Sequence, residues 1–379
     1  MEFNLSEEHL MIQKAARDFA NEHLKPGVIE RDEHQKFPAE QIKMMGELGF
    51  LGMMVDPKYG GGGMDAVSYV LAMEEISKID ASASVCMSVN NSLVCWGLET
   101  FGNEEQKQKY LVPLAKGEIV GAFCLSEPEA GSDATSQRTT AIDKGDYYLL
   151  NGTKNWITNG SSASVYLVIA QTDVDKKHKG INAFIIERGM EGFIVGAKEN
   201  KMGIRGSDTH TLLFNDVKVP KANRIGEDGF GFTFAMRTLS GGRIGIASQA
   251  LGIASGAYEL ALAYSKERKA FGKPIHQHQA IAFKLADMAT EIEAARLLCL
   301  KAAWLKDNHL DYGTASAMAK VFASRVAMWV TTEAVQVHGG YGYVKEYHVE
   351  RLMRDAKITQ IYEGTTEVQK IVISRAILS

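Results

Sequence analysis

The spacing of apolar residues changes twice along the chain, and these two changes limit the possible folds more than any other feature. Residues 1–120 show mainly helical spacing, with apolar residues three and four positions apart. Residues 121–232 contain short β-branched and aromatic runs separated by Gly, Asn and Asp clusters. Helical spacing returns in residues 233–379. We therefore predict an α+β protein with an N-terminal α-helical domain, a central β domain and a C-terminal α-helical domain, divided at these positions.

Both helical parts carry recognisable local signals. Ser6 precedes acidic residues and an amphipathic stretch, which predicts a capped helix that ends before Pro26. In the C-terminal part an apolar stripe has the spacing of a helix-bundle seam, and we interpret it as core. The stripe consists of Ile281, Leu285, Met288, Ile292, Ala295 and Cys299.

The central part lacks the pattern of a nucleotide-binding parallel sheet. The runs 147–150 and 165–169 predict strands, and Asn151-Gly152 between them predicts a hairpin turn. Helices of about 10–15 residues do not separate these runs, so alternating strand–helix crossovers are not supported. No GxGxxG motif follows a strand either, which argues against a Rossmann unit.

Composition excludes several functional classes. A chain of 379 residues is long enough for two or three domains, and its charged residues nearly balance to a net charge of -4. That balance gives no broad field for nucleic acid or an anionic membrane surface. The four cysteines form no CxxC pair, so we expect neither a disulfide framework nor a metal site, and a reducing compartment fits best.

The N-terminus also bears on location. It is acidic and leads directly into the predicted helix, unlike a secretory signal or an Arg-rich transit peptide. No window reaches the roughly 18 uninterrupted apolar residues of a spanning helix. We therefore expect a soluble protein that is cytoplasmic, or one whose targeting segment has already been removed.

Two segments of the central part have residues suited to a cofactor. The loop 123–133 combines hydroxyls, glycine and proline, and such loops present backbone N–H groups to anions, although the same residues are common in plain turns. About 25 residues later, Trp156 and Thr158 have the period-two spacing of one strand face. A planar indole beside a hydroxyl suits a flavin ring, while a β-core aromatic is the alternative for Trp156.

Two segments of the C-terminal part suit a phosphate or a closely approaching ligand. Arg268 lies among other cations at the end of a predicted helix. These cations are either a solvated charge cluster, or Arg268 forms a two-pronged contact with a pyrophosphate and Gln279, just beyond, binds another polar group. Further on, Gln336 precedes His338 and the pair Gly339-Gly340, where glycine lets a ligand approach the backbone. We interpret His338 as structural because it has no evident catalytic partner.

The last candidate is a carboxylate near the C-terminus. Glu363 lies between Tyr362 and Gly364, in a place where desolvation would raise its pKa toward that of a working base. Helix capping explains the threonines that follow and Glu367 but does not explain Glu363.

With these segments in this order, the chain resembles the acyl-CoA dehydrogenase family from end to end, closest to its short-chain, butyryl-CoA members. The resemblance implies a helical N-terminal domain, a central β-barrel domain and a C-terminal four-helix bundle. It also implies bound FAD, a homotetramer, electron-transfer flavoprotein as electron acceptor, and a role in fatty acid β-oxidation. The location would be cytoplasmic in a bacterium, or the mitochondrial matrix after removal of a transit peptide.

The resemblance also assigns residues to the cofactor. Around the flavin it places Phe123, Leu125, Ser126, Gly131, Ser132, Trp156 and Thr158. On the FAD of a neighbouring subunit it places Arg268, Phe271 and Gln279. The remaining dinucleotide contacts are Gln336, Gly339, Gly340, Thr365 and Glu367.

For the substrate, the resemblance makes Glu363 the base that removes the α-proton while hydride passes from the β-carbon to flavin N5. Relatives that carry their base in an earlier helix place it where this chain has Gly242, so no second carboxylate competes. The acyl-CoA contacts implied are Ser132, Ser240, Arg243 and Gly364. Many relatives have Asp at the position of Ser240, which weakens that one assignment.

Three alternatives remain at this stage. An acyl-CoA oxidase or a flavin-dependent hydroxylase could use the same scaffold, but such oxidases are longer chains and the hydroxylases tend to lack the Glu363 carboxylate. A flavin-free helical interaction protein would need only turns in the five segments. A nicotinamide-dependent dehydrogenase is the weakest alternative because the dinucleotide fingerprint is missing.

Overall fold

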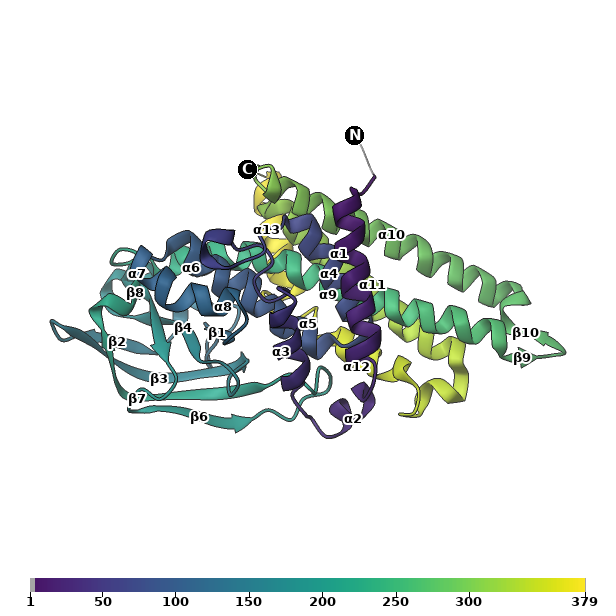
Figure 1. Ribbon diagram of the computed structural model, residues 1–379, viewed down its shortest axis with the longest axis horizontal. Coiled ribbons are helices and arrows are strands. Elements are labelled where there is room, and N and C mark those ends of the chain that lie inside the picture. The colour runs from purple at the N-terminus through teal and green to yellow at the C-terminus, as the bar shows by residue number, and fades with distance from the viewer. Residues whose placement is uncertain (1–3, 379) are drawn as a thin grey trace.

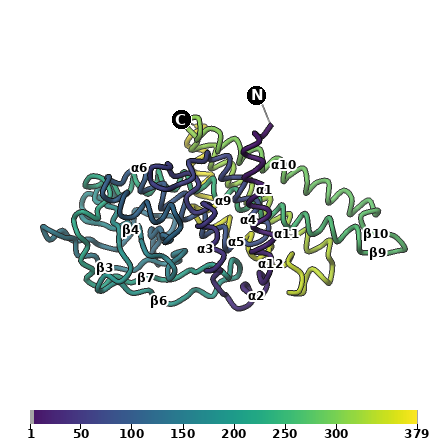
Figure 2. Tube along the Cα trace, in the orientation of Figure 1, coloured from purple at the N-terminus to yellow at the C-terminus, as the bar shows by residue number. Residues whose placement is uncertain are grey.

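The computed structural model describes residues 4–378, so the first three residues of the acidic N-terminus lie outside it. A β-sheet forms one end of the molecule and a bundle of long helices forms the other (Figure 1). The first helices of the chain lie between them, as the purple part of the trace in Figure 2 shows. The predicted succession of helical, β and helical parts is confirmed, while the exact boundaries at 120 and 232 stay predictions.

The N-terminal part is helical, and its first helix begins where the sequence predicts. Ser6 Oγ accepts a hydrogen bond from the His9 backbone N–H, and His9 Nδ1 in turn accepts from the Ser6 N–H, which completes a capping box. Three π-helical segments, 20–24, 89–95 and 107–111, interrupt the regular helices and were not predicted. The α-helices are α1 (Glu7–Phe19), α2 (Val28–Glu33), α3 (Ala39–Glu47), α4 (Ala66–Ile79), α5 (Ala81–Ser88), α6 (Trp96–Phe101), α7 (Glu104–Gln106) and α8 (Val112–Ala115).

The central part is one open, mixed, eight-stranded sheet. Its strands are β1 (Gly121–Cys124), β2 (Thr140–Asp143), β3 (Tyr147–Thr158), β4 (Val165–Gln171), β5 (Ile181–Glu187), β6 (Phe193–Lys198), β7 (Thr209–Pro220) and β8 (Arg224–Ile225). They follow the order β6-β7-β3-β2-β4-β5-β8, and β1 pairs in parallel with β4. Because β6 and β8 are both free edges, the sheet does not close into the expected barrel.

The predicted turn at Asn151-Gly152 is wrong. Both residues lie inside β3, where Asn151 pairs with β2 and Gly152 pairs with β7. Glycine is needed there for close approach, because a Cβ on Gly152 would lie 2.5 Å from Thr139 Oγ1. The hairpin turn falls earlier, at Gly145, whose φ is 92°.

The C-terminal part is a helical bundle built around one very long helix. Its helices are α9 (Gly231–Glu267), α10 (Gln279–Asp307), α11 (Gly313–His338), α12 (His348–Ile358) and α13 (Thr366–Leu378), and the short hairpin β9 (Lys269–Ala270) and β10 (Lys273–Pro274) joins α9 to α10. The predicted seam lies on α10 and is buried from Leu285 to Cys299, with Ile281 partly buried at its start. This core interpretation is confirmed.

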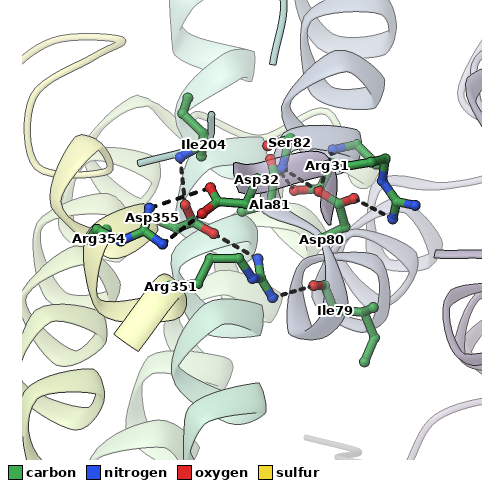
Figure 3. Close-up of polar contacts among 12 residues, drawn as sticks. Arg31, Asp32, Ile79, Asp80, Ala81, Ser82, Ile204, Arg351, Arg354 and Asp355 are labelled. Carbon is green, nitrogen blue, oxygen red and sulfur yellow. Dashed lines mark hydrogen bonds and ion pairs between the residues drawn. The ribbon is translucent and has the colours of Figure 1, made fainter. Parts of the chain in front are cut away.

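A network of ion pairs and hydrogen bonds connects α12 to the other two parts of the chain (Figure 3). The Asp355 carboxylate accepts hydrogen bonds from Arg351 at 2.9 Å and from the backbone N–H of Ile204 at 2.5 Å. Arg351 also donates to the Ile79 carbonyl at 2.7 Å, and Arg354 forms an ion pair with Asp32 at 2.7 Å. Since α12 leads directly into the segment 359–365, this network fixes where that segment lies.

None of the helices within residues 4–378 is both long and apolar enough to cross a membrane.

Candidate active site

The segment between α12 and α13 holds Glu363 in an unusual backbone conformation. Glu363 has a φ of 52° and Gly364 a φ of 87°, so two successive residues adopt the left-handed region. For a residue other than glycine this costs about 1–2 kcal/mol and persists only where the surroundings enforce it. Thr365 then caps α13 by accepting a hydrogen bond from the Val368 N–H, and Glu367 lies exposed in the first turn.

The Glu363 carboxylate points into the protein without a partner. The residue as a whole is partly buried, but its Oε2 is fully buried and has no hydrogen bond to any described part of the chain. Burial raises the pKa of Glu363 to about 7, while the positive charges of Lys320 and Arg243 act in the opposite direction. A carboxylate with this pKa is suited to accept a proton near neutral pH.

Glycine at position 242 creates the space for this carboxylate. A Cβ on Gly242 would lie 2.2 Å from Glu363 Oε2 and 2.7 Å from Leu93 Cδ2, closer than any real contact. Gly242 lies in the middle of α9, so the long helix forms one wall of the Glu363 site and the π-helical segment around Leu93 forms another.

Arg243 follows on α9 and is 8% exposed. Burial lowers the pKa of its guanidinium, an effect opposed by Glu363 and Tyr312, and its Nε is a buried donor that no described residue satisfies. Ser240 lies one turn earlier and donates its hydroxyl to the Met236 carbonyl at 3.1 Å. Of the two predicted acyl-CoA contacts on α9, only Arg243 therefore has a side-chain donor that is left without a partner among the described residues.

Sequence reasoning missed Lys320, which is fully buried on α11. Its Nζ donates to the Gly364 carbonyl at 2.7 Å, and burial lowers the pKa of its ammonium group to about 8. A signal for it exists in the sequence. Lys320 stands four positions after Ser316 and three before Ala323, both buried, so it occupies a core position of an otherwise small and apolar helix face.

The sheet carries a second group of predicted residues. Phe123 lies on β1 and stacks on Phe234 of α9 with ring centroids 6.3 Å apart, which connects the sheet to the helix that carries Gly242. The Ser126 carbonyl accepts a hydrogen bond from the Asn155 N–H at 2.9 Å, which holds the loop after β1 against β3. The predicted residues on β1, on the loop after it and on β3 are Phe123, Leu125, Ser126, Trp156 and Thr158, with Gly131 and Ser132 exposed on the same loop.

Trp156 presents its indole to the outside. Its φ is 57° and it stands at a β-bulge in β3, so a period-two argument does not decide which face it occupies. The residue is 55% exposed, which excludes the alternative of a β-core aromatic.

A buried ion pair that sequence reasoning also missed supports this loop. Lys154 Nζ lies 2.7 Å from the Glu127 carboxylate and donates to the Leu125 carbonyl at 3.0 Å. Glu127 additionally accepts from the backbone N–H groups of Arg138 and Thr139. The pair is almost completely buried, so it fixes both ends of the loop 123–139.

A third group lies at the far end of the bundle. Arg268, Gly339 and Gly340 line a groove of about 530 Å³, and the Arg268 guanidinium lies 5.5 Å from the centre of the Tyr341 ring. Phe271, at the tip of the β9–β10 hairpin, is 96% exposed. Gln279 and Gln336 are exposed at the start of α10 and near the end of α11. Figure 1 shows the hairpin and the sheet at opposite ends of the molecule, so the structure does not bring this group and the sheet group together.

His338 belongs to the wall of the same groove. It stacks on Tyr264 with ring centroids 4.3 Å apart, and its Nδ1 hydrogen-bonds to the Ala334 carbonyl at 2.8 Å. Burial lowers the pKa of the imidazole. These contacts support the structural interpretation. No group of three or more His, Cys, Asp and Glu residues among positions 4–378 has the geometry to hold a metal ion.

Comparison with known protein families gives three consecutive matches. The N-terminal domain of acyl-CoA dehydrogenases matches residues 6–118, the middle domain matches residues 122–217, and the C-terminal domain matches residues 229–378.

Individual relatives match over the whole chain. A short-chain specific acyl-CoA dehydrogenase of Clostridium acetobutylicum is 52% identical over 374 residues, which is 99% of each chain. The solved butyryl-CoA dehydrogenase of Megasphaera elsdenii is 51% identical, with a TM-score of 0.98 and full coverage of both chains. A chain in a solved structure described as the electron transferring flavoprotein of Acidaminococcus fermentans is 54% identical, with a TM-score of 0.99 and full coverage of both.

Proposed function

Because the chain belongs to the acyl-CoA dehydrogenase family, we propose that it oxidises a short-chain acyl-CoA to the trans-2-enoyl-CoA by removing hydrogen from the α and β carbons. The protein is an FAD-dependent oxidoreductase that acts on acyl-CoA thioesters. We also propose which residue acts as the base, how long the acyl chain is, how the subunits share FAD and which protein accepts the electrons.

The observation that carries the proposal is the buried, unpartnered carboxylate of Glu363. A thioester α-proton is weakly acidic, so its removal needs a base held within about 2.6–3.2 Å and shielded from water. Glu363 has an oxygen that is free of hydrogen bonds to the described chain, a pKa raised by burial to about 7, and a clear space over Gly242. We assign it as the residue that takes the α-proton.

The residues of the sheet group fit a flavin. Trp156 offers a flat aromatic surface that is 55% exposed, and a Cβ added at Gly131 would meet no atom within 4 Å, so the loop is open to a ligand. We assign Phe123, Leu125, Ser126, Gly131, Ser132, Trp156 and Thr158 to the flavin end of FAD. When bound, FAD accepts the hydride that leaves the β-carbon.

The bundle group fits the dinucleotide end of a different FAD molecule. Arg268 can form a fork with a pyrophosphate, and the exposed backbone of Gly339-Gly340 permits close approach. Because this group and the sheet group lie at opposite ends of one chain, each FAD would be completed by a neighbouring subunit. We therefore propose a homotetramer in which Arg268, Phe271, Gln279, Gln336, Gly339 and Gly340 contact the FAD of a neighbouring subunit. Thr365 and Glu367, which follow Glu363 at the start of α13, are proposed as the remaining dinucleotide contacts.

A short acyl chain is supported by the polar wall beside Glu363. Tyr69 donates to Ser88 Oγ at 3.2 Å, and Tyr362 donates to Gln249 Oε1. Burial raises the pKa of both tyrosines, and the negative charge of Glu363 adds to this effect, so both lie near the carboxylate. We propose that these polar groups limit the length of the acyl chain, because a chain that displaced them would break buried hydrogen bonds. The names of the two short-chain and butyryl-CoA relatives point the same way.

The proposed acyl-CoA contacts start from a buried donor that has no hydrogen-bond partner among the described residues. Arg243 has a buried, unsatisfied Nε among the described residues, and a thioester ligand with its phosphates and amides can supply the acceptor. We propose Arg243, Gly364 and Ser132 as acyl-CoA contacts. Ser240 is the weakest of the predicted set because its hydroxyl already donates within α9. We further propose electron-transfer flavoprotein as the electron acceptor, in keeping with the description of the Acidaminococcus fermentans structure.

The test is an anaerobic titration of the purified, FAD-loaded protein with butyryl-, hexanoyl- and octanoyl-CoA, followed by visible absorbance. We expect butyryl-CoA to bleach the flavin band more readily than hexanoyl-CoA or octanoyl-CoA does. Glu363→Gln should retain FAD and bind the thioester but bleach about 10²–10⁴-fold more slowly, the range for loss of a general base. A protein that stays colourless after FAD is supplied would sink the proposal, and bleaching of Glu363→Gln at the wild-type rate would refute the base.

A further inference from the structure

We propose that Lys320 is a positioning residue for the base: its ammonium group holds the Gly364 carbonyl and so fixes the left-handed turn that carries Glu363, and its charge favours the carboxylate form of Glu363. This inference rests on the proposed role of Glu363 and adds a buried residue of α11 to the site.

The first part of the argument is the geometry of the turn. The Gly364 carbonyl accepts two hydrogen bonds from the protein interior, one from Lys320 Nζ at 2.7 Å and one from Gln369 Nε2 at 3.0 Å. Gln369 Nε2 also donates to the Glu363 carbonyl at 3.1 Å. A strained turn needs such external bonds to persist, because its own backbone conformation is unfavourable. Lys320 therefore connects the turn to α11, which is an independent and rigid element.

The second part is the cost of placing a lysine there. Lys320 is fully buried, and a buried ammonium group is strongly unfavourable unless it is paired and hydrogen-bonded. An apolar side chain would fill the same position of α11 without that cost. Among residues 4–378, the Lys320 ammonium group donates to the Gly364 carbonyl, so its charge lies against the turn that carries the base.

The third part is electrostatic. Lys320 and Arg243 are the cations that favour the ionised form of Glu363, from α11 and α9 respectively. Because Arg243 is expected to bind the substrate, Lys320 is the cation whose charge stays directed at Glu363 once the substrate is present. The charged and titratable groups that face this pair from the surrounding elements are Arg243, Glu367, Tyr69 and Tyr362.

The experiment measures the pH dependence of flavin reduction by butyryl-CoA in the FAD-loaded enzyme and in three variants. Lys320→Met removes both the hydrogen bond and the charge, and Lys320→Gln keeps a donor but removes the charge. Lys306→Met is the matched control, because Lys306 is also largely buried in the bundle, with a pKa lowered by burial to about 8, but its Nζ contacts Met54 Sδ at 3.6 Å instead of the base turn.

We expect the acid limb of kcat/KM to move up by about one to two pH units in both Lys320 variants, the shift that follows from removing a nearby opposite charge. At pH 7, with a wild-type midpoint near 7, this corresponds to a loss of about 5-fold to 50-fold in the ionised fraction of the base. The control should keep the wild-type midpoint. FAD content and Tm establish that each variant is folded, and if Lys320→Met does not fold then Lys320→Gln decides the question.

An unchanged midpoint in a folded Lys320 variant would overturn the inference, even if its Tm were lower, because a purely structural lysine would affect stability and not the titration of the base. The proposed function is tested separately by Glu363→Gln. If that variant is inactive while the Lys320 variants titrate like wild type, the base assignment stands and only the role of Lys320 fails.

Discussion

Replacing Glu363 by Gln should make the protein more stable, and by an amount that grows with pH. The pKa of Glu363 is raised by burial to about 7 from an ordinary value of 4.5. A carboxyl group whose folded-state pKa is raised contributes stability below its unfolded pKa and loses that contribution as the pH rises through the folded pKa. Glutamine has nearly the same shape as glutamate and does not titrate. The variant therefore does not lose stability through position 363 as the pH rises.

The magnitude follows from the two pKa values. Between about pH 5 and about pH 8, linkage predicts that wild type loses about 2–3 kcal/mol of unfolding free energy relative to Glu363→Gln. With an unfolding entropy of about 2.1 cal/mol/K per residue, a chain of 379 residues should show a Tm gap that widens by about 3 °C over this range.

The assay is thermal unfolding of wild type and variant side by side, in matched buffers with saturating FAD. Subtracting the two Tm values at each pH removes the general acid destabilisation that both proteins share, and any constant effect of the amide. A gap that stays flat from about pH 5 to about pH 8 would show that the carboxylate is not desolvated, and the argument for Glu363 as base would lose its physical basis.

Three further substitutions test other parts of the structure. Gly242→Ala would place a Cβ 2.2 Å from Glu363 Oε2 and should lower kcat about 10-fold or more while FAD is retained, whereas Gly241→Ala, whose Cβ meets no atom closer than 3.9 Å, should react at the wild-type rate in the same stopped-flow assay. Lys154→Met breaks the buried pair behind the flavin loop and should cost about 3–5 kcal/mol and release FAD on gel filtration, so full flavin content would contradict the proposed support of that loop. Asp355→Ala leaves Arg351 buried without its carboxylate and should lower Tm by several degrees, which differential scanning fluorimetry would detect; an unchanged Tm would mean that the network of Figure 3 does not hold the parts together.

Local signals in the sequence were sufficient where a residue's structure depends on its near neighbours. The helix cap at Ser6 follows from the local residue types, and the buried face of α10 follows from spacing, because helix geometry sets which residues share a face. Asn151-Gly152 shows the limit of such signals. The dipeptide favours a turn, but the ladders with β2 and β7 supply hydrogen bonds on both sides and place it inside β3.

The parts of the site that sequence reasoning missed depend on distant contacts. Lys320 could be located on a core-facing position of α11, but its partner is the carbonyl of Gly364, which lies 44 positions away and carries no side-chain signal. The same holds for Lys154, which is separated from Glu127 by 27 positions and whose importance comes from complete burial. Backbone acceptors and burial are properties of the fold, so no pattern of residue types reports them.

The site thus has a division of roles that follows from where each charge is buried. Glu363 lies on a turn that is unfavourable by itself, and a base in such a place would drift unless something outside the turn held it. Lys320 and Gln369 hold the backbone on one side, the absence of a side chain at Gly242 leaves the carboxylate its space on the other, and neither contact occupies the proton-accepting oxygen. The backbone of Glu363 is therefore fixed while its Oε2 stays free, which is the condition a base must meet to be both aligned and reactive.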